Sequence, residues 1–224
     1  MPVRERKKVL VEVAVDDWVL RIWARRNVLD EARVASLRFA EELASYAIRD
    51  PGFKRARRPI PVPQDAPPIV KEMARLSALA GVGPAFTFRG ALLDYVGLAL
   101  AQDLKEVSAS CGGDHFVLAG KPGRLALPGN RKLALVVPAE LGFKGIHTEI
   151  GRSEGSASGA DILAVVAESC ILADAVAAAA TTIMARRRSL HAGLAFLKAI
   201  PGIHGAVVVQ GTRIGLAGNV ELAA

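Results

Sequence analysis

A thiol, two glycines, a carboxylate and an imidazole follow one another in the stretch Cys111-Gly112-Gly113-Asp114-His115. A glycine pair can adopt positive φ and offer backbone N–H groups to a ligand. Asp114 can accept a hydrogen bond from a ribose hydroxyl or a ring N–H, and Cys111 can act as a nucleophile only if its pKa is lowered. A hairpin turn between two strands explains the glycines equally well, but it does not explain the reactive side chains around them.

A second candidate site is the segment "FRGALLD", which contains Arg89, Gly90 and Asp94. Arg89 and Asp94 are five residues apart, so they do not lie above one another on a helix face. Gly90 would let a ligand or a second backbone approach near the expected helix start, where anions are favoured. The segment is therefore a candidate phosphate site, although a solvated helix with one tolerated glycine explains the same residues.

The other two candidates are a polar loop and a lone carboxylate. Residues 151–161 read "GRSEGSASGAD", and Ser153, Gly155 and Ser156 could wrap a phosphate there. By composition alone this loop cannot be told from a flexible linker. Asp174 lies within an alanine-rich segment that is typical of a helix. If Asp174 faces inward, its carboxylate needs a cation, a hydrogen-bond donor or a metal as a partner.

Other motifs for chemistry are missing from the sequence. No Walker loop, Rossmann fingerprint or catalytic-triad motif occurs in it. The histidines have no spacing typical of metal ligands, so we expect each to be structural or exposed. They are His115, His147, His191 and His204.

Helices and strands are expected to mix without regular βαβ alternation, which favours an α+β fold. Apolar-polar alternation predicts a hairpin over residues 8–24 with its turn at Asp16-Asp17. A proline-rich connector is expected at residues 58–68 within a single domain that spans residues 1–224. Expected helices cover 30–48, 68–79, 87–104, 169–186 and 190–199, expected strands cover 106–110, 115–119, 133–137 and 162–167, and a last pair of strands turns near Gln210-Gly211.

The composition limits the classes of partner. The net charge is +7, but the basic clusters are not interleaved with aromatic residues, which single-strand nucleic-acid binding would need. We therefore expect an anionic small ligand and no nucleic acid. The two cysteines give no disulfide framework and point to a reducing compartment, so we expect a cytoplasmic protein. The apolar stretch 160–184 contains acidic residues and is not expected to span a membrane.

Taken in order, the four candidate segments resemble the motifs of the ApbE-like superfamily, whose best-known members are FAD:protein FMN transferases. In those enzymes a Lys-Gly-x-x-x-Asp helix precedes an Asn-x-Gly-Gly-Asp turn, a Ser-Gly loop and an Ala-Asp-Ala-x-Ser-Thr helix. The segments here read "RGALLD", "SCGGD", "GRSEGSASG" and "ADAVAA". The chain is most similar to a shorter ApbE-like family of prokaryotic proteins, through "DPGFK", "APPIVKEMARLSALAGVGP" and the closing "PGIHGAVVVQGTRIGLAGNVEL".

The resemblance implies an ApbE-like α+β fold, a ligand cleft and FAD or FMN as a cofactor. It implies that Arg89, Gly90, Asp94, Gly112, Gly113, Asp114, Ser153, Gly155 and Ser156 bind the cofactor, and that Asp174 is a catalytic residue and a magnesium ligand. The chain shows no counterpart of the extended N-terminal part and the His-rich segment of the transferases, and it departs from the family pattern at four further points. These departures weaken the expectation of magnesium and of FMN transfer. Arg89 replaces lysine, Cys111 replaces asparagine, Ala178 replaces the threonine that helps to hold magnesium, and "IHTEI" replaces the Thr-Ser-Gly entrance to the loop.

Three functions remain open on this basis. The first is a protein that binds a flavin nucleotide or a related phosphorylated ligand, with residual magnesium-dependent transfer chemistry. The second is a component of sulfur metabolism with Cys111 as catalytic thiol, because the resemblance links short relatives to sulfur incorporation into homocysteine. The third is a non-catalytic interaction subunit. The small residues of the 169–186 helix also make a homodimer an option.

Overall fold

An eight-stranded antiparallel sheet forms the centre of the computed structural model, which describes residues 8–129, 133–137, 142–151 and 160–223. Its order is β1-β2-β3-β4-β7-β8-β9-β10, so neighbours in space follow one another along the chain except between β4 and β7, where two strands of a smaller sheet intervene. The strands are β1 (Val9–Val15), β2 (Trp18–Ala24), β3 (Val107–Cys111), β4 (Asp114–Leu118), β7 (Phe143–Ile150), β8 (Ile162–Ala167), β9 (Ile203–Gln210) and β10 (Arg213–Gly218).

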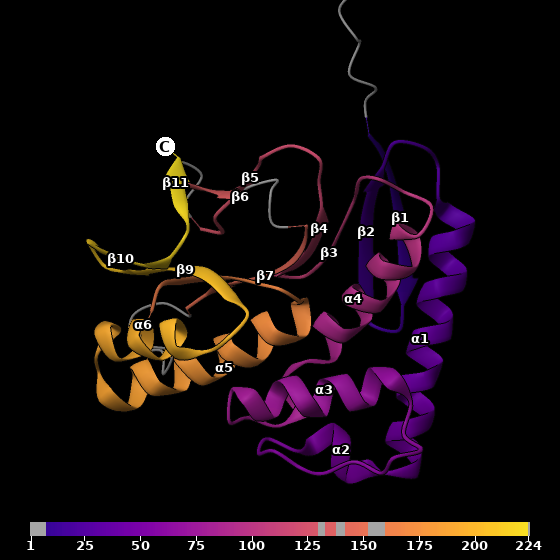
Figure 1. Ribbon diagram of the computed structural model, residues 1–224, viewed down its shortest axis with the longest axis horizontal. Coiled ribbons are helices and arrows are strands. Elements are labelled where there is room, and N and C mark those ends of the chain that lie inside the picture. Colours follow the sequence, from indigo (N-terminus) through magenta and orange to yellow (C-terminus); the bar gives the residue numbers. More distant parts are fainter. Residues whose placement is uncertain (1–7, 130–132, 138–141, 152–159, 224) are drawn as a thin grey trace, which may run out of the picture.

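Helices enter this meander as two insertions. The first lies between β2 and β3 and contains α1 (Leu29–Arg49), α2 (Pro51–Arg55), α3 (Pro68–Leu79), a 3-10 turn at Pro84–Phe86 and α4 (Phe88–Ala101). The second lies between β8 and β9 and contains α5 (Cys170–Arg187) and α6 (Leu190–Ala199). Figure 1 shows α5 and α6 along one side of the sheet. A three-stranded sheet lies on the other side, in the order β11 (Glu221–Ala223), β6 (Ala134–Val137), β5 (Gly123–Ala126).

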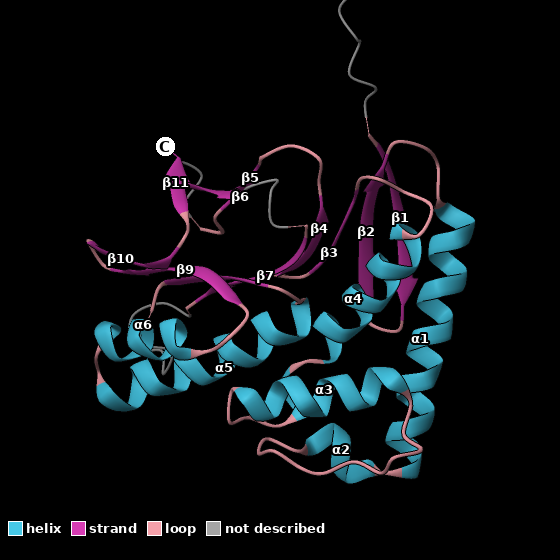
Figure 2. Ribbon diagram, viewed as in Figure 1, coloured by secondary structure: helices cyan, strands magenta, loops and turns pink. Residues whose placement is uncertain are grey.

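The middle of the large sheet is buried on both faces, and β8 shows this most clearly. All of its residues are buried. Leu163, Val165 and Ala167 pack with the helices, whereas Ile162, Ala164 and Val166 pack toward the small sheet. Because side chains alternate across a strand, one apolar run serves two cores. Figure 2 shows the resulting layers of helix, large sheet and small sheet.

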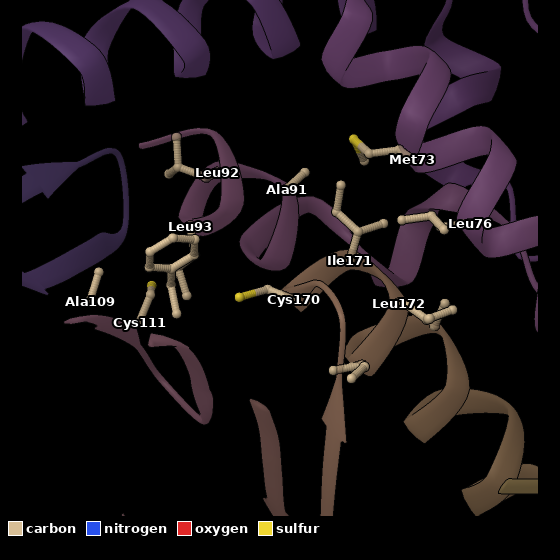
Figure 3. Packing of buried hydrophobic residues seen from close by; sticks show 14 of the residues in the cluster. Met73, Leu76, Ala91, Leu92, Leu93, Ala109, Cys111, Cys170, Ile171 and Leu172 are labelled. Atoms are coloured by element: carbon tan, nitrogen blue, oxygen red, sulfur yellow. The ribbon is translucent and has the colours of Figure 1, made fainter. Parts of the chain in front are cut away.

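The start of α5 is fixed by the core that joins three helices to β3. Met73 and Leu76 of α3 and Ala91 of α4 lie around Ile171, in the first turn of α5 (Figure 3). Side chains in such a close-packed interior have little freedom to shift. The core therefore holds the beginning of α5 close to the beginning of α4.

The α+β class, the N-terminal hairpin and the five helices expected from the sequence are confirmed. Residues 56–67, between α2 and α3, contain no helix or strand. Helix α1 ends at Arg49, but Pro51 also begins α2, because the Asp50 carboxylate accepts hydrogen bonds from the amides of Gly52 and Phe53. The sequence analysis missed β5, β7 and β11. No helix in the described part of the chain is long and apolar enough to cross a membrane.

Candidate functional site

The turn between β3 and β4 is fixed against β7. Cys111 pairs with Asp114, which leaves a two-residue turn of Gly112 and Gly113, and Gly112 has a φ of +59°. The backbone N–H and the hydroxyl of Thr148 both donate to the Gly113 carbonyl, at 2.7 and 2.9 Å. A Cβ at Gly113 would lie 1.9 Å from the Thr148 carbonyl oxygen. Both glycines are therefore required by the backbone: Gly112 by its positive φ and Gly113 by the close approach to β7.

Arg89 lies at the start of α4, next to this turn. Its Nε donates to Oδ2 of Asp114 at 2.9 Å, and its guanidinium lies about 3.3 Å from where a Cβ of Gly112 would be. The Arg89 side chain is 41% exposed, whereas that of Asp114 is fully buried. Burial by itself would lower the pKa of Arg89, but the charges of Asp114 and Asp174 outweigh it and raise the pKa. Arg89 is thus a fixed cation with part of its surface open to solvent.

His147 of β7 joins two buried carboxylates from different elements. It lies opposite Asp114 in the register between β4 and β7. Its Nδ1 is 2.6 Å from Oδ1 of Asp114 and 3.0 Å from Oδ1 of Asp174 on α5. The sheet register and the packing of α5 therefore bring together three ionisable groups that are far apart in the sequence.

The face of α5 that meets β7 carries two polar side chains, Asp174 and Thr181. Cys170, Asp174, Ala178 and Thr181 follow one another at the spacing of one helix face. Oδ2 of Asp174 accepts a hydrogen bond from the backbone N–H of Gly90 at 3.0 Å.

Glu149 of β7 lies between His147 of the same strand and Thr181 of α5. The hydroxyl of Thr181 donates to its Oε1 at 2.6 Å, and its Oε2 is 3.7 Å from Nε2 of His147. Side chains two residues apart on a strand share a face, so His147 and Glu149 both point toward α5. The imidazole therefore has a carboxylate near each of its two nitrogens.

Burial and charge oppose each other in this cluster. Burial lowers the pKa of His147, but the hydrogen bonds with Asp114 and Asp174 and the nearby Glu149 carboxylate outweigh it and raise the pKa well above its usual value. Burial raises the pKa of Asp114, but His147 and Arg89 prevail and lower it to about 2. The pKa of Asp174 is well above its usual range because of burial and of the neighbouring Asp114 charge. The positively charged, protonated form of the His147 imidazole is thus strongly favoured in the cluster.

Asp94 lies one turn after Gly90 and serves the helix α5. Its Oδ1 and Oδ2 accept hydrogen bonds from the backbone N–H groups of Cys170 and Ile171, at 2.8 and 3.0 Å. Burial raises the pKa of Asp94 to about 6, although these two hydrogen bonds oppose the shift. Its carboxylate therefore holds α4 to the first turn of α5, a position where negative charge is favoured by the helix dipole.

Sequence comparison identifies the family. The family model described as "AbpE bacteria" matches residues 3–193. The chain belongs to this AbpE family. A UPF0280 protein of Methanospirillum hungatei is 32% identical over 179 residues, which cover 74% of this chain and 71% of that protein. The UPF0280 protein Mbar_A3697 of Methanosarcina barkeri is 27% identical over 230 residues, which cover 98% of this chain and 88% of that protein.

Solved structures share the fold of this AbpE family member at low sequence identity. The flavin transferase ApbE from Vibrio cholerae superposes with a TM-score of 0.63 over 97% of each chain, at 14% identity. Such an identity establishes the shared fold and no more. The ApbE-like fold that the ordered motifs predict is thereby confirmed.

Cys111 of this AbpE protein lies next to the cluster but lacks the surroundings of a reactive thiol. Cys111 is 4% exposed and lies among core side chains (Figure 3), where burial raises the pKa of its thiol. Reactive cysteines have the opposite environment, exposed and electropositive. Ser153, Gly155 and Ser156 lie outside the described residues. A cavity of about 580 Å³, lined in part by Trp23, His115 and Arg124, opens elsewhere, between β4 and the small sheet.

The sequence analysis of this AbpE protein missed His147 and Glu149. The signal was available in "GIHTEI", where Gly145, His147 and Glu149 alternate with Ile146, Thr148 and Ile150. Period-two alternation is typical of a strand. The polar half of the pattern faces α5 instead of solvent, so this strand carries the site.

Proposed function

We propose that this AbpE family member binds a flavin nucleotide, or a related phosphorylated ligand, beside the turn at Gly112 and Gly113. The observation that carries the proposal is the position of Arg89. A buried carboxylate, Asp114, holds its Nε, while the partly exposed guanidinium remains accessible beside the turn. Arginine fixed in this way is well suited to a phosphate group, because its planar fork can donate two parallel hydrogen bonds.

The assignment of a flavin rests on the shared fold together with this anion-binding position. The Vibrio cholerae protein with the same fold is a flavin transferase. Counterparts of the four ordered motifs of that superfamily occur in this chain, with the departures named above, and three of them supply Arg89, Asp114 and Asp174. We assign Asp94 to a structural role, because both of its oxygens already accept hydrogen bonds from α5.

Magnesium-dependent FMN transfer is not part of the proposal. Magnesium takes oxygen ligands in octahedral geometry. Ala178 provides no side-chain oxygen at the position where the resemblance implies a threonine, and an imidazole nitrogen lies beside Asp174 instead. These donors do not fit magnesium. The sulfur-metabolism alternative is also left out, because the Cys111 thiol is buried and its pKa is raised.

The test compares the affinity for FMN with that for riboflavin, which has the same ring system and no phosphate. A hydrogen bond to a charged group contributes about 1.5–3 kcal/mol. We therefore expect FMN to bind about 10- to 100-fold more tightly than riboflavin, and Arg89→Gln to remove most of this difference. Fluorescence quenching of the flavin on titration with protein measures both affinities.

Arg124→Gln is the matched control, since Arg124 lines the separate cavity beside the small sheet. Its FMN affinity should equal that of the wild type, and a thermal melt checks that each variant is folded. Equal affinities for FMN and riboflavin would refute the role of the phosphate. A loss of FMN binding in Arg124→Gln, with Arg89→Gln unaffected, would place the ligand in the other cavity.

A further inference from the structure

We propose that Asp114, His147 and Asp174 form a binding site for a divalent transition-metal ion such as Zn²⁺ or Co²⁺, and that this site discriminates against Mg²⁺. The donors come from β4, β7 and α5, and one donor atom of each lies within 4.8 Å of the others. The inference concerns the same cluster as the flavin proposal but does not depend on it, because it rests on the protein donors alone.

Two carboxylate oxygens converge on one ring nitrogen in this cluster. Oδ1 of Asp114 and Oδ1 of Asp174 lie 2.6 and 3.0 Å from Nδ1 of His147. A single N–H has one proton and cannot form a linear hydrogen bond with both oxygens. A metal ion can bind all three atoms at once. Ligands about 2.1 Å from one ion lie roughly 3.0–3.4 Å apart, so the donors would need to separate by less than about 1 Å.

Each of the three donor side chains also has a second polar partner, on the side away from the shared point. Each aspartate directs Oδ1 at His147, whereas its Oδ2 accepts a hydrogen bond, from Arg89 for Asp114 and from the Gly90 amide for Asp174. The other nitrogen of His147, Nε2, lies 3.7 Å from Glu149. Metal-binding carboxylates and imidazoles in proteins typically have such outer partners, which fix the orientation of the ligand. This arrangement would be unnecessary for a solvated acidic cluster.

The donor types decide which metal fits. Imidazole nitrogen suits Zn²⁺, Co²⁺ and related ions, whereas Mg²⁺ prefers carboxylate, carbonyl and water oxygens. Asp114, Asp174 and His147 are 0%, 3% and 9% exposed, so the ion would be largely shielded by protein. Two carboxylates also balance the charge of a dication, which a buried site requires.

The test uses untagged full-length protein that has been treated with a chelator and dialysed, without any flavin. Isothermal titration should show one Zn²⁺ per chain, with Mg²⁺ binding at least about tenfold more weakly. Co²⁺ should also bind once per chain and give visible absorption bands characteristic of a protein-bound ion. This spectrum needs no variant, so it tests the site even if a variant fails to fold.

His147→Gln should weaken Zn²⁺ binding by about 100-fold or more, because it removes a ligand. Glu149→Gln keeps all three ligands and should weaken Zn²⁺ binding by about tenfold, through the orientation of His147. His191→Gln is the matched control, since His191 is exposed on α6 and should not affect metal binding.

Three results would overturn the inference: no saturable Zn²⁺ or Co²⁺ binding, Mg²⁺ binding as tight as Zn²⁺ binding, or an equal loss in the His147 and His191 variants. The first of these would make the cluster an internal salt-bridge network held by a protonated imidazole. Failure of the flavin proposal remains separable, because the metal titrations contain no flavin and the flavin titrations depend on Arg89.

Discussion

Gly90→Ala tests whether α4 and α5 meet as closely as the site requires. A Cβ at this position would lie 2.6 Å from Oδ2 of Asp174 and 2.7 Å from the Cys170 carbonyl oxygen. The clash should cost about 1–3 kcal/mol, because both neighbours are fixed in the core. Pushing Asp174 away also weakens its hydrogen bond with the Gly90 amide, which contributes about 1.5–3 kcal/mol when one partner is charged.

Alanine has a better helix propensity than glycine, which offsets about 1 kcal/mol of this loss. The free energy of unfolding should therefore fall by about 1.5–5 kcal/mol. Urea denaturation of the wild type and the variant, followed by circular dichroism, measures the difference.

The matched control is Gly123→Ala in β5. A Cβ there has no heavy atom within 4 Å in the described part of the chain, and Gly123 has no positive φ. The control should change the free energy of unfolding by less than about 0.5 kcal/mol. A Gly90→Ala protein as stable as the wild type would refute the reasoning, because it would mean that α4 does not pack against Asp174 at this point.

Two further predictions concern buried groups near the cluster. The folded-state pKa of Asp94, about 6, exceeds its ordinary value of 3.8, so its contribution to stability is present at low pH and is lost as the pH rises from about 4 to 6. Relative to Asp94→Asn, wild-type protein should lose up to about 3 kcal/mol over that range in urea denaturation, and a constant difference would contradict the burial of the carboxylate. In a Cys170→Ala background, iodoacetamide should alkylate Cys111 far more slowly in the native than in the unfolded protein. Rapid native alkylation at neutral pH would show an activated thiol and support the sulfur-carrier alternative.

Much of the fold can be predicted because the alternation of apolar residues and the positions of prolines agree with the way that the elements pack. The hairpin at residues 8–24 has strict alternation, and the helix at 68–79 begins at the proline that opens α3. The strand β7 also alternates with a period of two over residues 145–150, but its composition masks this signal. It lies inside the sheet, yet Lys144, His147 and Thr148 give it the composition of a surface loop. Here tertiary contacts with α5 outweigh local composition.

The site was predictable in part for a related reason. Arg89, Asp114 and Asp174 stand in motifs that occur in a known order, so the resemblance identifies them. The position of Asp174 in an alanine-rich helix also predicts that its carboxylate needs a partner if it faces inward. The sequence does not name that partner, because His147 reaches Asp174 only through the register of β4 with β7 and the packing of α5. The alternation around His147 can indicate a strand, but it does not show which groups that strand meets.

The most direct test of the proposed function is the small-molecule content of the protein as purified. Protein prepared without added flavin would be denatured, and the released molecules would be identified by mass spectrometry, with Arg89→Gln prepared in parallel. We expect the wild-type protein to release a phosphorylated ligand, FMN or FAD first of all. We expect the occupancy of that ligand to be clearly lower in Arg89→Gln than in the wild type. The proposed function would be contradicted by wild-type protein that releases no phosphorylated molecule and also shows no saturable binding of FMN or FAD.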